Sequence, residues 1–350
     1  MEFAGTQGVQ QTLRSLAELK DQLATPTEAL IAEAAALKGD LIVLGAAGKI
    51  GPNIVRLLAR AGEVAGIHRR VFAVSRFRDR EKAAELEAAG AILCEVDLTK
   101  DGALEALPDA ANVLYLIGAR FGTTGKEAEM WFVNTFLPGR VVERFRSSRI
   151  VALSTGNVYP LTPVEGPWPT EETPPDPVGE YAMSCLGRER VMTHCAARTG
   201  TSLGLIRLNY SVEMRYGPIV DMARAVRAGE PIDLAMGHLN LVWQGYSNEV
   251  ILRCFRRVGS PPFVINVTGP ELVSVRETTV RIATLMRKRP VFRGISTPTA
   301  LLSDAGRCHS LFGLPAVGLD ALISKTVHWM EDGLPLFNKP SGFQSRKGAF

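Results

Sequence analysis

The chain has 350 residues, enough for one large α/β domain with a smaller lobe and more than a single minimal domain needs. Its 46% hydrophobic and 22% charged residues are typical of a globular protein, and a net charge of +4 does not indicate a nucleic-acid-binding surface. No apolar run reaches the roughly 18 residues of a membrane helix, and the first residues, Met1–Gly5, lack the basic and apolar regions of a secretory signal, so none is expected. We therefore expect a cytoplasmic protein with neither a membrane nor a nucleic-acid partner.

The five cysteines are odd in number and form no Cys-x-x-Cys pair, and the five histidines are scattered. This pattern predicts reduced thiols, with no disulfide framework and no metal site.

Residues 1–39 are predicted to form a helical arm ahead of the first strand, with helix over 7–37. Thr25 is expected to cap the second part of this arm, with Pro26 at the first helical position and Glu28 three residues after the cap. Two alternatives stay open for the arm: it packs on the core, or it makes a dimer contact.

From residue 40 onward, short β runs alternate with helical segments. Strands separated by helices of this length form βαβ units, so residues 40–208 are predicted to be a Rossmann domain, a doubly wound parallel sheet with helices on both faces. The predicted strands are 40–44, 71–74, 91–96, 112–117, 149–153 and 202–208, and the predicted helices are 52–61, 80–89, 126–145 and 181–198.

The remaining segments are less regular. The proline-rich stretch 161–178 is expected to be a long ordered loop, and 209–337 a smaller α/β substrate-binding lobe that can interleave with the Rossmann sheet. The polar residues 338–350 are expected to be a flexible tail.

A glycine-rich turn directly follows the first predicted strand and opens the next helix. Its spacing, Gly-x-x-Gly-x-x-Gly, suits backbone amides that bind a diphosphate beside a helix N-terminus. The predicted cofactor-binding residues in this turn are Gly45, Ala47, Gly48, Lys49, Ile50 and Gly51. Gly118, after the fourth predicted strand, is added to the same set.

The choice of cofactor depends on the end of the second predicted strand. A carboxylate there would hold the ribose of NAD, but the first acid is Asp79, and Ser75 and Arg76 precede it. Because guanidinium groups suit a 2′-phosphate, we predict NADP. The alternative is that Arg76 stacks on the adenine, with NAD bound.

These motifs resemble the extended short-chain dehydrogenase/reductases, the NAD-dependent epimerase/dehydratase family, over about residues 40–335. The resemblance implies that Asp97 and Leu98 hold the adenine and that Thr155, in the run Leu153–Pro160, is the catalytic Ser/Thr. It also places Asn134 in a proton relay. Asn209, in the run Arg-Leu-Asn-Tyr, is expected to contact the substrate, as are Arg120 and Lys126 after the fourth predicted strand.

The family's Tyr-x-x-x-Lys motif matches only in part, because Tyr181 is followed four residues later by Cys185. In the family the lysine holds the nicotinamide ribose and lowers the pKa of the tyrosine, which otherwise titrates near 10. Three alternatives remain: Arg188 supplies the charge, Tyr181 acts only as a hydrogen-bond donor, or Cys185 has chemistry of its own through a lowered thiol pKa.

The resemblance implies an NAD(P)-dependent oxidoreductase or epimerase that acts on a hydroxyl or keto group of a sugar-like or polyol small molecule, as a homodimer. The missing lysine favours the alternative of a dinucleotide-binding protein without catalysis, serving as a redox sensor or partner subunit.

Overall fold

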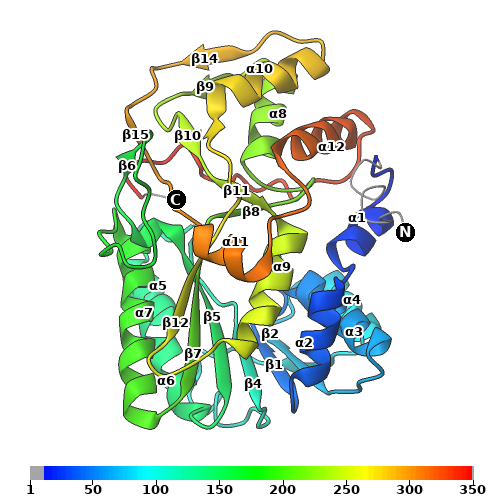
Figure 1. Ribbon diagram of the computed structural model, residues 1–350, viewed down its shortest axis with the longest axis vertical. Coiled ribbons are helices and arrows are strands. Elements are labelled where there is room, and N and C mark those ends of the chain that lie inside the picture. The colour runs from blue at the N-terminus through cyan, green and yellow to red at the C-terminus, as the bar shows by residue number, and fades with distance from the viewer. Residues whose placement is uncertain (1–11, 121, 349–350) are drawn as a thin grey trace.

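The computed structural model describes residues 12–120 and 122–348, and its centre is a seven-stranded parallel sheet (Figure 1). The strand order is β12-β7-β5-β4-β1-β2-β3, with every neighbouring pair parallel. The predicted Rossmann-type doubly wound sheet is therefore confirmed. The strands are β1 (Leu41–Leu44), β2 (Val71–Ser75), β3 (Ile92–Glu95), β4 (Asn112–Tyr115), β5 (Arg149–Thr155), β7 (Ser202–Leu208) and β12 (Phe263–Val267).

Both faces of the sheet are covered, which explains why β1 is apolar throughout. Leu41 and Val43 face one hydrophobic cluster, and Ile42 and Leu44 face another on the opposite side. Helices α2 (Glu28–Ala36), α3 (Gly51–Val64) and α9 (Gln244–Arg253) lie on the first side, and α6 (Leu137–Arg144) and α7 (Glu180–Thr199) on the second. No helix in the described part of the chain is long and apolar enough to cross a membrane. The helices beside the sheet are α3 (Gly51–Val64), α4 (Arg80–Ala88), α5 (Glu127–Trp131), α6 (Leu137–Arg144), α7 (Glu180–Thr199), α9 (Gln244–Arg253) and α11 (Gly306–Phe312).

The helix predicted over 126–145 is not one regular helix. Between α5 and α6 lies a π-helical segment, Phe132–Phe136, whose last turn is closed by the amide of Leu137 donating to the carbonyl of Phe132. Pro138 has no amide proton to donate to the carbonyl four residues earlier, that of Asn134. The Arg188 side chain supplies the missing donor, with Nε 3.1 Å from that carbonyl oxygen.

The N-terminal arm contains two helices, α1 (Leu16–Leu23) and α2 (Glu28–Ala36). The cap of α2 is Thr27, whose Oγ1 accepts from the amide of Leu30, so the predicted cap at Thr25 is two residues early. Thr25 instead donates its hydroxyl to the carbonyl of Asp21. Helix α1 packs into the core of the lobe and α2 into the core beside the sheet, so the arm joins the two. Residues 1–11 of the predicted arm lie outside the described residues.

The smaller lobe is built on three helices, α8 (Pro218–Ala228), α10 (Val275–Leu285) and α12 (Leu319–Glu331). Strand β12 leaves this part of the chain and pairs with β7, which joins the lobe to the sheet. Short strand pairs complete the lobe and its border with the proline-rich loop. They are β8 (Tyr210–Val212) with β11 (Leu241–Trp243), β9 (Pro231–Asp233) with β14 (Val291–Arg293), β10 (His238–Leu239) with β13 (Val273–Ser274), and β6 (Thr162–Pro163) with β15 (Thr299–Ala300).

Residues 338–348 are ordered, which corrects the predicted flexible tail over that range. We call this segment the C-terminal strap. The amide of Ser341 donates to Asp221 Oδ2 at 2.7 Å, Phe343 is buried in the lobe core, and the Arg346 guanidinium donates to the carbonyl of Thr299 at 2.6 Å. These tertiary contacts leave no signal in a polar, weakly patterned sequence.

Candidate cofactor and catalytic site

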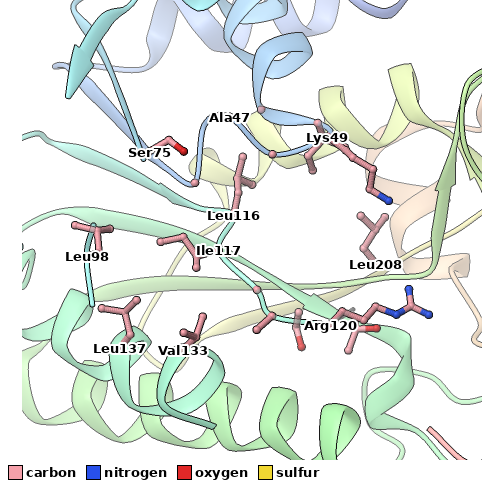
Figure 2. A pocket seen from close by; sticks show the side chains of 18 of the residues that line it. Ala47, Lys49, Ser75, Leu98, Leu116, Ile117, Arg120, Val133, Leu137 and Leu208 are labelled. Carbon is pink, nitrogen blue, oxygen red and sulfur yellow. The ribbon is translucent and has the colours of Figure 1, made fainter. Parts of the chain in front are cut away.

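A cleft of about 1060 Å³ lies at the carboxyl ends of the central strands, between the sheet and the lobe (Figure 2). Carboxyl ends of parallel strands are where open α/β sheets bind ligands. Most residues predicted for the site line this cleft together: Gly45, Ala47, Gly48, Lys49, Ile50, Gly51, Ser75, Arg76, Asp97, Leu98, Gly118, Thr155, Tyr181 and Asn209. Lys126, Asn134 and Cys185 do not line it.

The glycine-rich turn leaves room and donors for a diphosphate. Gly45 has φ +86°, which favours glycine, and a Cβ on Gly51 would lie 2.1 Å from the carbonyl oxygen of Ala46. No side chain caps the N-terminus of α3, and among the described residues no group accepts from the amides of Lys49 and Ile50. The residues present therefore fit a dinucleotide whose phosphates are bound by backbone amides and the helix dipole.

Among the described residues, the end of β2 has cations and no free carboxylate for a ribose. Asp79 is used as the cap of α4. Arg76 and Arg78 line the cleft, and Arg76 Nη1 lies 4.0 Å from Asp97 Oδ2. A hydrogen bond from the Thr99 hydroxyl, together with the charge of Arg76, holds the pKa of Asp97 below its usual value. Asp97 therefore places an ionised carboxylate in the cleft near the end of β2, where its oxygens can accept hydrogen bonds.

Tyr181 and Cys185 are hydrogen-bonded to each other on α7. The thiol is fully buried, and burial raises its pKa, while burial followed by the neighbouring Cys185 raises the pKa of Tyr181. Burial therefore disfavours the alternative in which Cys185 is an activated thiolate. Cys185 is buried and packs beside Val158 and Tyr159.

Two arginines, Arg188 and Arg120, lie near Tyr181. Arg188, which the sequence analysis named as a source of positive charge, has the weaker effect on the pKa of Tyr181. Arg188 is occupied by the carbonyls of Asn134 and Leu153, its Nη1 lying 2.7 Å from the latter oxygen. The guanidinium carbon of Arg120 lies 5.5 Å from the centroid of the Tyr181 ring, and Arg120 lowers the pKa of Tyr181 more than Arg188 does. Arg120, which the sequence analysis named as a substrate contact, thus also supplies positive charge beside the Tyr181 phenol, as the family's lysine would.

The amide of Asn134 is saturated by protein groups. Its Oδ1 accepts from the amide of Ala119 and from Arg188, and its Nδ2 donates to the carbonyl of Ala119 and to Ser184 Oγ. This corrects the predicted proton relay, because no hydrogen-bonding position of the side chain remains for a water or a substrate. Asn134 fixes the loop that carries Arg120 against α7.

Thr155 lies at the end of β5, where its Oγ1 accepts from the amide of Asn157 at 3.2 Å and its hydroxyl proton can still be donated. The strand end is held from behind by a buried network that the sequence analysis missed. Ser154 Oγ donates to Glu189 at 2.5 Å, and Glu189 pairs with Arg207 at 2.7 Å. The available signal was helical spacing, since Glu189 is eight residues after Tyr181 on the same face of α7.

Of the three residues predicted to contact the substrate, Asn209 and Arg120 line the cleft and Lys126 does not. Asn209 lines the cleft, and its Nδ2 donates to Ser303 Oγ at 3.1 Å. Lys126 is exposed at the start of α5, outside the cleft, which corrects its assignment to the substrate.

Lys49 sends its side chain away from the amides of its own turn. Its Nζ lies 2.9 Å from the centroid of the Tyr216 ring in the lobe, and in Figure 2 it points across the cleft toward the side that holds Leu208 and Arg120. Burial, assisted by Arg120 and Lys339, lowers the pKa of Lys49 to about 7. The lysine is therefore a titratable group of the cleft as well as part of the turn.

Comparisons with known proteins agree with this geometry. The model of the NAD dependent epimerase/dehydratase family matches residues 41–227, more than half of the chain. No curated protein gives a significant match. Similar solved structures include MoeE5 in complex with UDP-glucose and NAD, with 23% identity, a TM-score of 0.68 and coverage of 84% of this chain and 99% of that chain.

Two further structures share the fold at lower identity. The UDP-glucuronic acid 4-epimerase from Bacillus cereus, in complex with UDP-glucuronic acid and NAD, has 14% identity and a TM-score of 0.70, covering 83% of this chain and 99% of that one. The UDP-glucose 4-epimerase from Thermotoga maritima, with UDP-glucose, has 18% identity and a TM-score of 0.69, covering 84% and 99%.

Proposed function

Because this chain belongs to the NAD dependent epimerase/dehydratase family, we propose that it is an NAD(P)-dependent oxidoreductase or epimerase for a hydroxyl or keto group of a nucleotide-linked sugar. The observation that carries the proposal is that the phosphate-binding turn, Thr155 and Tyr181 line one cleft. The similar structures named above bind UDP-glucose or UDP-glucuronic acid, which supports UDP-sugars as the first class to test. A homodimer and a cytoplasmic location stay predictions.

The side chains suggest how the reacting oxygen is handled. A bound nicotinamide supplies the hydride acceptor or donor. Thr155 and Tyr181 hold the substrate oxygen through their hydroxyls, and because the pKa of Tyr181 is raised, its phenol stays protonated at neutral pH. Tyr181 is then a proton donor to a carbonyl oxygen, and proton removal from a hydroxyl becomes easier as the pH rises. Arg120 stabilises the phenolate once it forms.

For the cofactor we propose NADP, on the strength of Arg76 and Arg78 and the absence of a free carboxylate among the described residues at the end of β2. Calorimetric titration with NADP and NAD separately tests this choice. NADP is expected to bind more tightly, and Arg76→Ala to weaken NADP binding about tenfold while NAD changes little. Tighter binding of NAD, with no effect of Arg76→Ala, would assign NAD.

The test of function is turnover across a panel of UDP-sugars and their keto forms, followed by nicotinamide absorbance and by sugar analysis. Tyr181→Phe is expected to lower kcat at least 100-fold with little change in cofactor affinity, since proton transfer by a positioned side chain contributes about that factor. The substitution of the motif lysine by Cys185 favours a second candidate, a dinucleotide-binding protein without catalysis. Cofactor binding without turnover, and a Tyr181→Phe variant identical to the wild type, would support the second candidate.

A further inference from the structure

The cleft carries a concentration of positive charge away from its phosphate-binding amides. Lys49 comes from the glycine-rich turn, Arg120 from the loop after β4 and Lys339 from the C-terminal strap, and all three line the cleft. Arg120 and Lys339 each act on Lys49 as like charges. Three cations from distant parts of the chain, gathered beside one cavity, repel one another unless an anion joins them.

The nearby carboxylates already have protein partners. Glu213 accepts from the Nε and the amide of Arg215, each at 2.9 Å, and Asp221 accepts from the amide of Ser341 at 2.7 Å. Both lie close enough to act on Lys49, yet neither makes an ion pair with it, and the Lys49 ammonium lies on the Tyr216 ring instead. A cation on an aromatic face is available to a stronger, anionic partner.

The position of Arg120 indicates which part of a substrate would bind to these cations. Its guanidinium lies over the ring of Tyr181, and it is hydrogen-bonded to Tyr210 on the lobe side. In Figure 2, Lys49 and Arg120 approach the cleft from two different loops, with Leu208 beside the space between their charged ends. An anion held by both would therefore lie next to the oxygen that Tyr181 contacts, on the reacting sugar, whereas a cofactor diphosphate belongs at the amides of the turn.

We propose that Lys49 and Arg120 together bind a carboxylate carried by the sugar, so that the substrate is a nucleotide-linked uronic acid rather than a neutral sugar. The inference rests on the proposed function and makes it more specific. Lys339 adds positive charge to this group from the strap, and Tyr216, Glu213 and Asp221 are the titratable groups that face Lys49 from the lobe.

The test is the affinity of the cofactor-loaded protein for UDP-glucuronic acid, UDP-glucose and UDP, measured by calorimetry at pH 6.5 and 8.5. We expect UDP-glucuronic acid to bind at least tenfold more tightly than UDP-glucose at pH 6.5, and Lys49→Met and Arg120→Met each to remove most of this preference. The preference should shrink at pH 8.5, where Lys49 loses its proton, and persist there in Lys49→Arg. Lys126→Met, an exposed change outside the cleft, is the matched control and should alter nothing.

The outcomes separate the two proposals. If wild-type protein binds all UDP-sugars without a preference for the carboxylate, or if Lys49→Met weakens UDP-glucose and UDP as much as UDP-glucuronic acid, the cations hold the substrate's diphosphate and the inference is overturned. If the cofactor binds but no UDP compound does, the proposed substrate class itself is wrong. A pH-independent preference that Lys49→Met leaves intact would also overturn the role of Lys49.

Discussion

The residue four positions after Tyr181 decides how the tyrosine can act. A lysine there would add a positive charge beside the phenol, whereas the neutral thiol of Cys185 leaves the pKa of Tyr181 raised. Each unit by which the pKa rises lowers the phenolate fraction at pH 7 about tenfold. Oxidation of a hydroxyl, which needs the phenolate, is therefore the direction most weakened by this substitution.

Restoring the lysine should strengthen that direction. Cys185→Lys is expected to raise the rate of substrate oxidation at pH 7 at least tenfold, and to bring the pH–rate curve to a plateau at a lower pH than in the wild type, whose rate should still rise toward pH 10. Steady-state rates between pH 6 and 10 measure both effects. Cys185→Met adds similar bulk without charge and should show neither, so an equal gain in that variant would contradict the electrostatic account.

Lys49 is expected to make the folded state more stable as the pH rises. Its pKa is about 7 in the folded protein and near 10.5 when unfolded, so between these values the unfolded chain binds more protons and stability increases with pH. Lys49→Met should therefore raise Tm most at or below pH 7, and the gain should disappear toward pH 10.5. Thermal unfolding of both proteins across this range checks it, and a gain that does not vary with pH would mean that the ammonium is not buried.

At the level of elements, the sequence predicted what depends on local pattern and missed what depends on tertiary contact. Six of the seven strands of the sheet and the glycine-rich turn were predicted, because alternation of β runs and helices and the spacing of glycines are local, whereas β12, which comes from the lobe, was not. The cap at Thr27, the π-helical segment before Pro138 and the ordered strap were missed, because each has a partner distant in sequence. The Thr27 hydroxyl donates to Glu249, Arg188 donates to the carbonyl of Asn134 in the π-helical segment, and the strap is bound by Asp221. The saturation of Asn134 and the approach of Arg120 to Tyr181 depend on loop geometry in the same way.

The C-terminal strap should contribute measurably to stability through Phe343. The ring is 3% exposed and packs in the core of the lobe, so Phe343→Ala is expected to lower the free energy of unfolding by about 3 kcal/mol. Urea unfolding measures it. Leu314→Ala, at a side chain 67% exposed, is the control and should change stability by no more than about 0.5 kcal/mol. A Phe343→Ala variant as stable as this control would contradict the packing of the strap and favour the predicted flexible tail.

At the scale of the whole molecule, exposed apolar side chains on and beside α7 are relevant to whether the protein forms a dimer. Phe136, 55% exposed, ends the π-helical segment, and Met183, 44% exposed, lies on α7, which packs beside that segment on one face of the sheet. We propose these two side chains as the place to test the homodimer that the sequence predicts, formed through the helices that flank the sheet.

A charge placed on this surface should separate the two copies. Phe136→Glu is expected to convert a dimer to a monomer at micromolar concentration, because a carboxylate buried without a partner costs several kcal/mol. Met183→Glu should act in the same direction. Sedimentation velocity measures the change, with Ile295→Glu as the control, since that side chain is 83% exposed and follows β14, which lies in the lobe, away from α7 (Figure 1). A wild-type monomer would contradict the predicted homodimer, and a dimer that survives Phe136→Glu and Met183→Glu but not Ile295→Glu would place the interface away from α7.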